Sequence, residues 1–396
     1  MRDPNSTGSI TLPSDFHFGH LRPDQTKPEA PTPPPPLGPL SAFVGDFIGN
    51  GFNTIFRPDS TATPTPLPNP VPPPPPPRDN ILELNLTSET LSFSRSLGSV
   101  PNRGTGTQPD AFLNGVPYLQ TINDITIHGE KVGIHVEPGI WIHVPSTLTP
   151  PLGETVSRMA SIPHGTTVEA QGLVDPATPG PPNIAPVDIT PFVIGSIPPK
   201  KVPPFASQTA SNPNTPRIPQ DLGPFITRGT ITQAMLDDPN SVLRDIINQQ
   251  TILSTTTLFV STAPPPPVGL FGGGTDNIAF LLGQASAGAP NAQAVQMTAV
   301  FWIETVQETI VVPPFHVGGP PFAIRGKRSV QGQRVPTFSV TPPFDLVAPR
   351  EIKVTFTQIQ YTQTVILNFA GLSWPHVSVN TLVPADDIIV PASAFA

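Results

Sequence analysis

Proline is the residue that most constrains how this chain can fold. Its ring fixes φ and removes the backbone N–H, so a dense run of proline cannot form the interior of a helix or a sheet. The 60 proline residues include dense runs at residues 31–39, 64–77 and 264–267. The stretches between these runs are poor in proline, and 37% of the chain is hydrophobic, including 22 Phe residues. The sequence therefore predicts a folded core interrupted by long Pro-rich loops.

The stretches between the proline runs alternate apolar and polar residues, as strands with one buried face do. In the front half these stretches lie at residues 81–87, 91–94, 117–127, 132–145 and 155–172. Further ones follow at residues 250–261, 277–282, 292–312 and 351–382. Short strands in close succession, separated by Gly and Pro turns, are typical of a sandwich or a barrel and not of a parallel α/β sheet. We therefore expect an all-β protein.

Residues 231–249 form the one stretch that has the pattern of a helix. Pro239 is expected to split this helix, with Asp238 capping its second half. The apolar residues of the second half share one helical face: Val242, Leu243, Ile246 and Ile247. The sequence thus predicts one short helical segment in an otherwise β protein.

Residues 37–56 contain a strand pattern spaced by Gly45, Gly49 and Gly51. Glycine inside a strand marks close backbone approach, or the sharp coiling that is needed where a barrel bends. Residues 1–36 end in four consecutive prolines, and we expect a disordered tail with extended polyproline geometry there. Residues 37–396 are taken as one domain. Its parts are the front strands (37–172), a Pro-rich linker and insertion (173–350) and the closing strands (351–390).

The charge and cysteine content exclude several classes of function. Only 12% of residues are charged, and 20 Lys and Arg face 28 Asp and Glu, for a net charge of −8. This balance argues against nucleic-acid binding and against attraction to an anionic membrane. The absence of Cys excludes disulfides, Cys–zinc sites and thiol catalysis. Without a long apolar window or a signal peptide, we expect a soluble, cytoplasmic protein that does not insert into membranes.

The stretch at residues 358–382 carries the first candidate site residue. It has the pattern of a long strand, a turn at residues 370–371 and a second strand that is entered through Trp374. In the second strand His376, Ser378 and Asn380 share one face. A single imidazole on a polar face beside a Trp suits a metal or haem ligand, and it equally suits a histidine that only makes hydrogen bonds.

A second group of candidates lies on the strand at residues 132–145. His135 and Glu137 are two residues apart and therefore face the same side, where a carboxylate can hold the tautomer of a His or shuttle a proton. A solvent-facing pair is the alternative. Trp141 and His143 share this face if the strand keeps its phase through Pro138. His164 follows a proline in a turn-like setting, which places it either at a cavity mouth or in a plain turn.

Four pieces of the chain resemble, in order, the motifs of the nitrobindin-like haem-binding β-barrels, a calycin-type family. Residues 45–55 resemble the Gly-x-Trp-x-Gly-x-Gly opening of that family and its following Thr-Ile, which here are Thr54 and Ile55. Residues 135–141 are similar to its His-x-Glu-x-Gly strand, and residues 162–166 fall at its Pro-Thr-Gly turn. Residues 374–382 look like the C-terminal strand that supplies the proximal haem ligand.

The sequence also departs from the family pattern. Phe47 replaces the Trp of the opening motif, and Asn53 replaces a Pro. Residues 173–350 have no counterpart in the compact barrel. They are expected to enlarge, cap or fill its cavity.

The resemblance implies an enlarged antiparallel calycin-like β-barrel that holds haem b, with His376 as the axial ligand of the iron. It implies a cofactor site that includes Thr54, Ile55 and Trp374. Ligand-pocket candidates are His135, Glu137, Trp141 and His164. Nitric oxide, peroxynitrite and peroxide are the reactants that this family membership would imply.

Two alternatives remain open at the level of the sequence. The first is a cofactor-free barrel that binds an apolar small molecule, with Phe and Trp lining the cavity and His135, Glu137 and His164 orienting the ligand. The second is a structural or interaction protein with a filled interior and a Pro-rich tail that docks partners. The haem hypothesis requires His376 to point into an open pocket, whereas a filled barrel requires no pocket. The sequence decides neither catalysis nor the oligomeric state.

Overall fold

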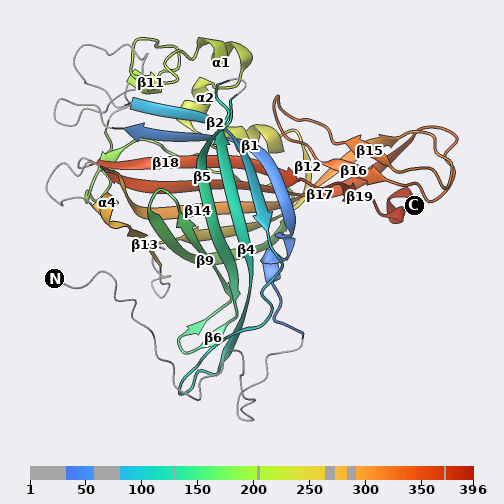
Figure 1. The fold of residues 1–396 in the computed structure, drawn as a ribbon, viewed down its shortest axis with the longest axis horizontal. Coiled ribbons are helices and arrows are strands. Elements are labelled where there is room, and N and C mark those ends of the chain that lie inside the picture. The colour runs from blue at the N-terminus through green and yellow to red at the C-terminus, as the bar shows by residue number, and fades with distance from the viewer. Residues whose placement is uncertain are drawn as a thin grey trace, which may run out of the picture.

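The first and last long strands of the chain lie side by side and help to close a barrel (Figure 1). The computed structural model of the protein describes residues 33–57, 81–127, 130–202, 206–263, 273–282, 291–369 and 372–396. The expected tail up to residue 32, the proline runs at 64–77 and 264–267, and the expected turn at residues 370–371 lie outside the described residues.

Ten antiparallel strands form the barrel, in the order β2-β1-β18-β17-β14-β12-β9-β8-β5-β4, and β4 pairs back with β2. In chain order these strands are β1 (Gly45–Arg57), β2 (Ile81–Phe93), β4 (Ala111–Asp124), β5 (Val132–Val144), β8 (Thr155–Ile162), β9 (Thr166–Pro179), β12 (Thr251–Ser261), β14 (Gln293–Val312), β17 (Arg350–Phe369) and β18 (Leu372–Pro384). The all-β expectation is confirmed. Closure leaves the barrel wall without an unpaired edge, since each of the ten strands has two neighbours.

The close backbone approach expected at the glycines of β1 is present at Gly49 and Gly51 but not at Gly45, where an added Cβ would meet no atom within 4 Å. A Cβ atom added at Gly51 would collide with the backbone oxygen of Val379 on β18, and one added at Gly49 would collide with that of Thr381. These two glycines therefore allow the first and last strands to cross tightly.

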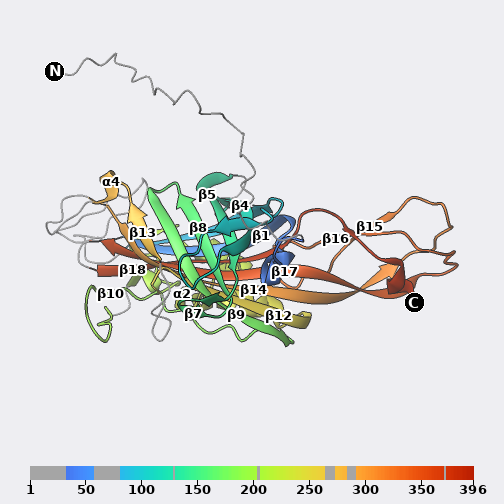
Figure 2. The same cartoon turned by 90° about the horizontal axis from the view of Figure 1, so that it is seen from below.

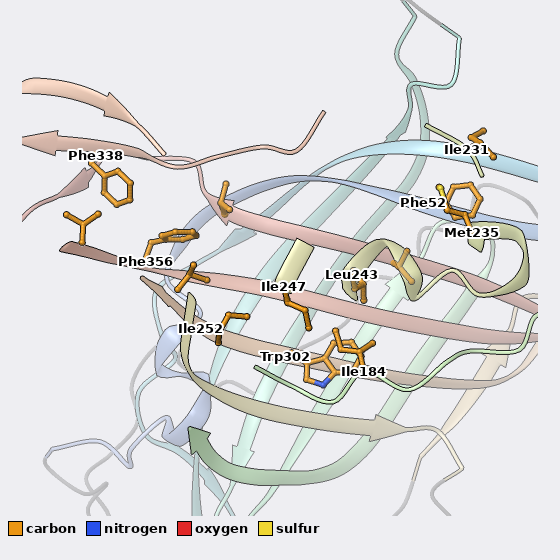
Figure 3. Packing of buried hydrophobic residues seen from close by; sticks show 14 of the residues in the cluster. Phe52, Ile184, Ile231, Met235, Leu243, Ile247, Ile252, Trp302, Phe338 and Phe356 are labelled. Atoms are coloured by element: carbon orange, nitrogen blue, oxygen red, sulfur yellow. The ribbon is translucent and has the colours of Figure 1, made fainter. Parts of the chain in front are cut away.

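The segment at residues 173–350 does not lie in the barrel interior. It contributes β12 and β14 to the barrel wall, and its helical part packs on the outer face of the wall (Figure 3). The small elements of that part are β10 (Phe192–Val193), η2 (Ala206–Gln208), β11 (Arg217–Ile218), α1 (Gly223–Arg228), α2 (Gln233–Asp237) and α3 (Ser241–Ile247). None of the helices in the described ranges is long and apolar enough to span a membrane.

The predicted break in the helical segment is confirmed. Pro239 lies between α2 and α3. The cap expected at Asp238 is wrong, because Asn240 is the N-cap residue of α3, and Asp238 accepts a hydrogen bond from the backbone N–H of Asn240 at 3.0 Å before the helix begins. Leu243 and Ile247 of α3 are buried in a cluster with Trp302 of β14. Burial of each such side chain contributes about 1.5–3 kcal/mol to the stability of this outer layer.

Two long strands run on past the barrel and carry a small extension with the C-terminus (Figures 1 and 2). They are β14 and β17, of 20 residues each. The extension consists of β15 (Phe322–Arg325), β16 (Thr337–Val340), β19 (Ile388–Ile389) and η3 (Ala392–Phe395). The remaining elements are η1 (Gly38–Ala42), β3 (Val100–Asn102), β6 (Thr147–Leu148), β7 (Pro151–Leu152), β13 (Gly274–Asn277) and α4 (Ala279–Leu282).

The strand alternation separates two apolar clusters, one inside the barrel and one outside it. On β1, Phe47 belongs to the inner cluster, whereas Phe52 belongs to the outer cluster beneath the helices. The inner cluster fills one half of the barrel, where Leu40 and Phe43 from the η1 region pack against Trp141 and its neighbours. The other half of the interior holds a cavity.

Candidate functional site

The cavity has a volume of about 730 Å³, which lies within the range of small-molecule sites. Its wall comes from β1, β2, β4, β5, β14, β17 and β18, together with the adjoining ends of β8 and β9, the turn between them, and α4. Apolar residues supply much of the wall: Ile55, Ile122, Ile162, Ala294, Val365 and Leu367. The packed half of the barrel lies behind this cavity. A filled barrel required an interior without a pocket, whereas this interior is filled in one half and hollow in the other.

His376 of β18 lines the cavity, as does Ser378 two residues further on, while Asn380 donates to the interior residue Glu89. The expectation that these three residues share one face is confirmed. The buried Nδ1 of His376 has no hydrogen-bond partner in the described part of the chain, and the ring is hydrogen-bonded to the backbone of Thr54. Burial, with the nearby His135 and His164 charges, lowers the pKa of His376 to about 4. At neutral pH the ring is therefore uncharged, with one nitrogen available to a ligand.

The other residues expected at the cofactor site occupy different places. Ile55 lines the cavity with His376. The buried side chain of Thr54 is not among the lining residues. Trp374 packs in the outer cluster against Phe56, with ring centroids 5.9 Å apart. The structure thus brings Ile55 to His376 and leaves Trp374 outside the cavity.

His135 and His164 both line the cavity, on a different part of the wall from His376. Their ring centroids are 5.6 Å apart. His135 Nε2 lies 3.2 Å from Oε2 of Glu137, and His164 is hydrogen-bonded to the backbone of Ile134. Burial against the wall and then the charge of His135 lower the pKa of His164. His164 therefore lies at the cavity, as one of its two expected settings required.

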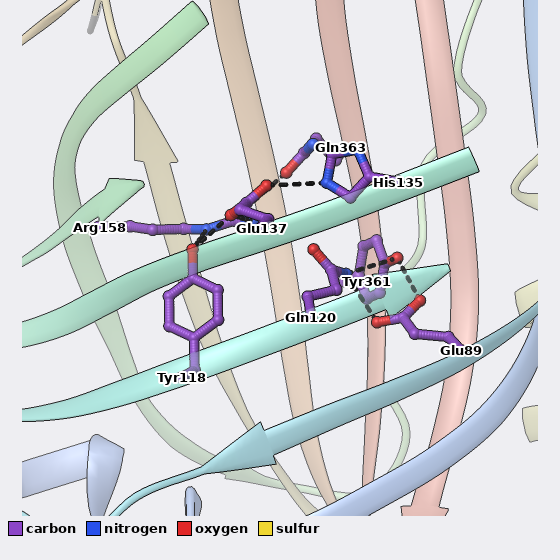
Figure 4. Close-up of polar contacts among 8 residues, drawn as sticks. All are labelled: Glu89, Tyr118, Gln120, His135, Glu137, Arg158, Tyr361 and Gln363. Carbon is purple, nitrogen blue, oxygen red and sulfur yellow. Dashed lines mark hydrogen bonds and ion pairs between the residues drawn. The ribbon is translucent and has the colours of Figure 1, made fainter. Parts of the chain in front are cut away.

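Glu137 is fully buried beneath His135 and does not face solvent, so the solvent-facing alternative for this pair is wrong. Arg158 of β8 donates through Nη2 to its Oε1 at 2.5 Å, and Tyr118 of β4 donates to the same oxygen (Figure 4). Burial raises the pKa of Glu137, but the charge of Arg158 and the hydrogen bonds of His135 and Tyr118 lower it to about 2. Glu137 is therefore an ionised anchor that fixes the orientation of His135.

A second buried carboxyl lies below the floor of the cavity. Glu89 of β2 accepts hydrogen bonds from Gln120 Nε2 at 2.7 Å, Tyr361 Oη at 2.6 Å and Asn380 Nδ2 at 2.8 Å. Gln120 and Tyr361 line the cavity, so they separate Glu89 from it (Figure 4). Burial raises the pKa of Glu89 to about 7, although its hydrogen-bond donors act against this rise. The group therefore exchanges a proton near neutral pH.

Sequence reasoning missed Glu89, Arg158, Tyr118 and Tyr361. The signal was present, because each is a polar or amphipathic residue at a position where the strand alternation predicts an inward side chain. On β5 the inward face keeps its phase through Pro138, since Trp141 and His143 are both buried. Trp141 packs in the inner cluster, away from the cavity.

The N-terminal end of the described chain also contacts this inward face of β5. His143 Nδ1 lies 2.9 Å from the backbone oxygen of Pro36. Asn114 of β4 donates to the backbone oxygen of Pro35 at 2.7 Å. The last residues of the expected tail are therefore anchored at the packed half of the barrel.

The described residues contain no group of three or more His, Asp or Glu side chains that is arranged to hold a metal ion. A metal at His376 would therefore need further ligands that the described chain does not supply, as the macrocycle of haem does. Comparisons of the chain with protein-family models, with curated proteins and with solved structures find no match. The fold and the site together define this protein as a closed β-barrel with an internal cavity in one half.

Proposed function

We propose that the protein binds haem b in this cavity, with His376 as the axial ligand of the iron. The observation that carries the proposal is the cavity-lining imidazole, whose buried Nδ1 has no partner in the described chain while the ring is held by the Thr54 backbone. An uncharged imidazole is a good donor to haem iron. The resemblance of residues 374–382 to a ligand-bearing strand supports the same assignment.

The other lining residues fit such a group. Ile55, Val365 and Leu367 offer apolar surface to a porphyrin face, as the walls of small-molecule sites commonly do. Bound haem would supply redox chemistry toward nitric oxide, peroxynitrite or peroxide. The chain itself orients the ligating ring through Thr54 and holds an exchangeable proton on Glu89 near neutral pH.

An absorption titration with hemin tests this proposal on the wild-type protein and the His376→Ala and Ser378→Ala variants. The wild type is expected to give a saturable Soret band. Loss of the ligand in His376→Ala weakens binding at least about tenfold and shifts the band, on the scale seen for metal sites that lose a supporting group. Ser378→Ala, the matched change two residues away on the same face, retains the wild-type band. An unchanged spectrum and affinity in His376→Ala would contradict the proposal.

An apolar small molecule without iron is the second candidate, favoured by the apolar wall and the volume of the cavity. For this function, the neutral fluorescent probe N-phenyl-1-naphthylamine is expected to bind the wild type and His376→Ala with equal affinity, while hemin gives no Soret shift. Probe binding that hemin abolishes in the wild type favours haem instead.

A further inference from the structure

Two histidines that haem ligation does not use lie on the cavity wall away from His376. His135 belongs to β5 and His164 to the turn between β8 and β9. In the barrel, three strands separate β18 from β5 on one side and five on the other. The pair and His376 therefore belong to nearly opposite sides of the wall, around one cavity.

Within the described residues, each ring of the pair is held by one contact. His135 Nε2 meets Glu137, and His164 meets the backbone of Ile134. The described chain provides no hydrogen-bond partner for the second nitrogen of either ring. Both rings line the cavity, with their centroids 5.6 Å apart. Two donors held this close can approach the two oxygens of one acceptor group.

The charges around the pair favour an anion as that acceptor. Among the described lining residues the only carboxylate is Glu83, and Arg57 Nη2 lies 2.6 Å from it. Beneath the pair, the charge of Glu137 is matched by Arg158. An anion between the two rings can accept a hydrogen bond from a ring N–H of each histidine.

We infer that His135 and His164 bind the carboxylate of the cavity's ligand, which is therefore an apolar molecule with an acidic end. The apolar side chains of Ile134 and Ile162 stand beside the pair in the lining and suit the body of such a molecule. A phosphate would require more positive charge, and the one arginine in the described lining is already paired. The carboxylate comes either from the propionate arms of a porphyrin or from a free fatty acid. Only the porphyrin source rests on the proposed function.

Two matched ligand pairs test the inference on the full chain. Calorimetry compares decanoic acid with 1-decanol, and absorption titration compares hemin with hemin dimethyl ester, whose propionates are blocked. We expect the wild type to bind the acid of at least one pair about tenfold more tightly, as for a charge-assisted hydrogen bond. The double variant His135→Gln, His164→Gln is expected to bind acid and blocked ligand equally. His316→Gln, the same change at an exposed histidine that does not line the cavity, is expected to keep the wild-type preference.

The outcomes separate the two sources and the two proposals. A preference for hemin alone assigns the carboxylate to a porphyrin, and one for decanoic acid alone assigns it to a fatty acid. A decanoic acid preference in a protein without a Soret band overturns haem binding and leaves the carboxylate site standing. The inference itself is overturned when the wild type prefers neither acid, or when the preference persists in the double variant. The single variant His164→Gln, at an exposed position, guards against misfolding and is expected to lose part of the preference.

Discussion

The two halves of the barrel interior are built by the same strands and differ in what their side chains do. On β5, Trp141 packs against Phe43 and Phe301 in the filled half, while His135 lines the cavity six residues earlier. On β17, Ile359 is fully buried in the filled half, while Val365 forms part of the cavity wall. The filled half provides close packing, and the hollow half gives up packing for a space that a ligand can occupy.

A polar layer marks the boundary between these halves. It consists of the ion pair Glu137–Arg158 with Tyr118, and of Glu89 with its three donors. Buried charges persist only where they are paired and hydrogen-bonded. The stability of the boundary therefore depends on a few specific ion-pair and hydrogen-bond partners. The stability of the filled half depends on many small van der Waals contacts.

The largest expected effect comes from breaking this boundary. Arg158→Met leaves the fully buried Glu137 without its cation, and removing one partner of a buried pair costs about 3–5 kcal/mol. Urea unfolding at pH 7 measures the loss. The double variant Arg158→Met, Glu137→Gln is the control, because it removes both charges and is expected to recover much of the stability. Equal stability of the single variant and the wild type would show that the boundary does not need the pair.

The second effect compares the same substitution in each half. Ile359→Ala in the filled half opens a space among buried side chains, at a cost of about 2–5 kcal/mol. Ile55→Ala faces a cavity that is already present, so its cost is smaller. Unfolding free energies of the two variants give the difference. Equal costs would mean that the hollow half is as tightly packed as the filled one.

The third effect is on the pH dependence of stability, because the pKa of Glu89 is raised to about 7 by burial. A carboxyl with a raised folded-state pKa gives its full stability below its unfolded pKa of about 4.3 and loses it as pH rises through the folded value. The Gln side chain of Glu89→Gln stays neutral at every pH. Between pH 4 and pH 8 the variant is therefore expected to lose about 1–3 kcal/mol less unfolding free energy than the wild type loses. Unfolding midpoints measured across this range provide the test.

Glu304 on the outer face supplies the control for that experiment. Its pKa is raised by burial to about 8, and Gln358 Nε2 donates to it at 2.6 Å. Glu304→Gln is expected to flatten the pH dependence of stability in the same direction. It does not line the cavity, so ligand affinity at each pH stays at the wild-type value. A change in affinity at Glu304→Gln would contradict the separation of inner and outer layers.

The smallest effect is expected at the mouth of the hollow half. Arg57 and Glu83 form a 2.6 Å ion pair in which Arg57 is 44% exposed. Solvent-screened pairs contribute about 0–1 kcal/mol. Arg57→Gln is therefore expected to leave the unfolding midpoint almost unchanged, with Lys353→Gln as a surface control. A larger decrease in the unfolding midpoint would show that the Arg57–Glu83 ion pair contributes to the stability of the fold.

The sequence predicted most strands because alternation is local, and it predicted the break at Pro239 because proline acts on its own backbone. The strand expected at residues 277–282 is wrong, since Ala279–Leu282 form the helix α4. It did not predict that β12 and β14 belong to the barrel wall, since strand order depends on pairing between distant segments. The faces of His376, Ser378 and Asn380 followed from alternation alone. The position of Trp374 did not, because alternation from His376 predicts an inward side chain two residues earlier, whereas Trp374 packs in the outer cluster against Phe56.

The division of the interior into a filled and a hollow half was also beyond local pattern. Inward positions could be counted along each strand, but which inward residues meet depends on the register of ten strands at once. Arg158 and Glu137 are 21 positions apart in the chain and meet across the paired strands β5 and β8. Glu89 and Asn380 are 291 positions apart.

The plug formed by Leu40, Phe43 and the anchored Pro36 closes the filled half, and this has a kinetic consequence. Because the packed half closes one end of the cavity, a ligand that enters and a ligand that leaves use the same opening. One occupant must leave before the next can settle, so the rate of exchange is set by the departure of the first and does not rise with the concentration of its competitor.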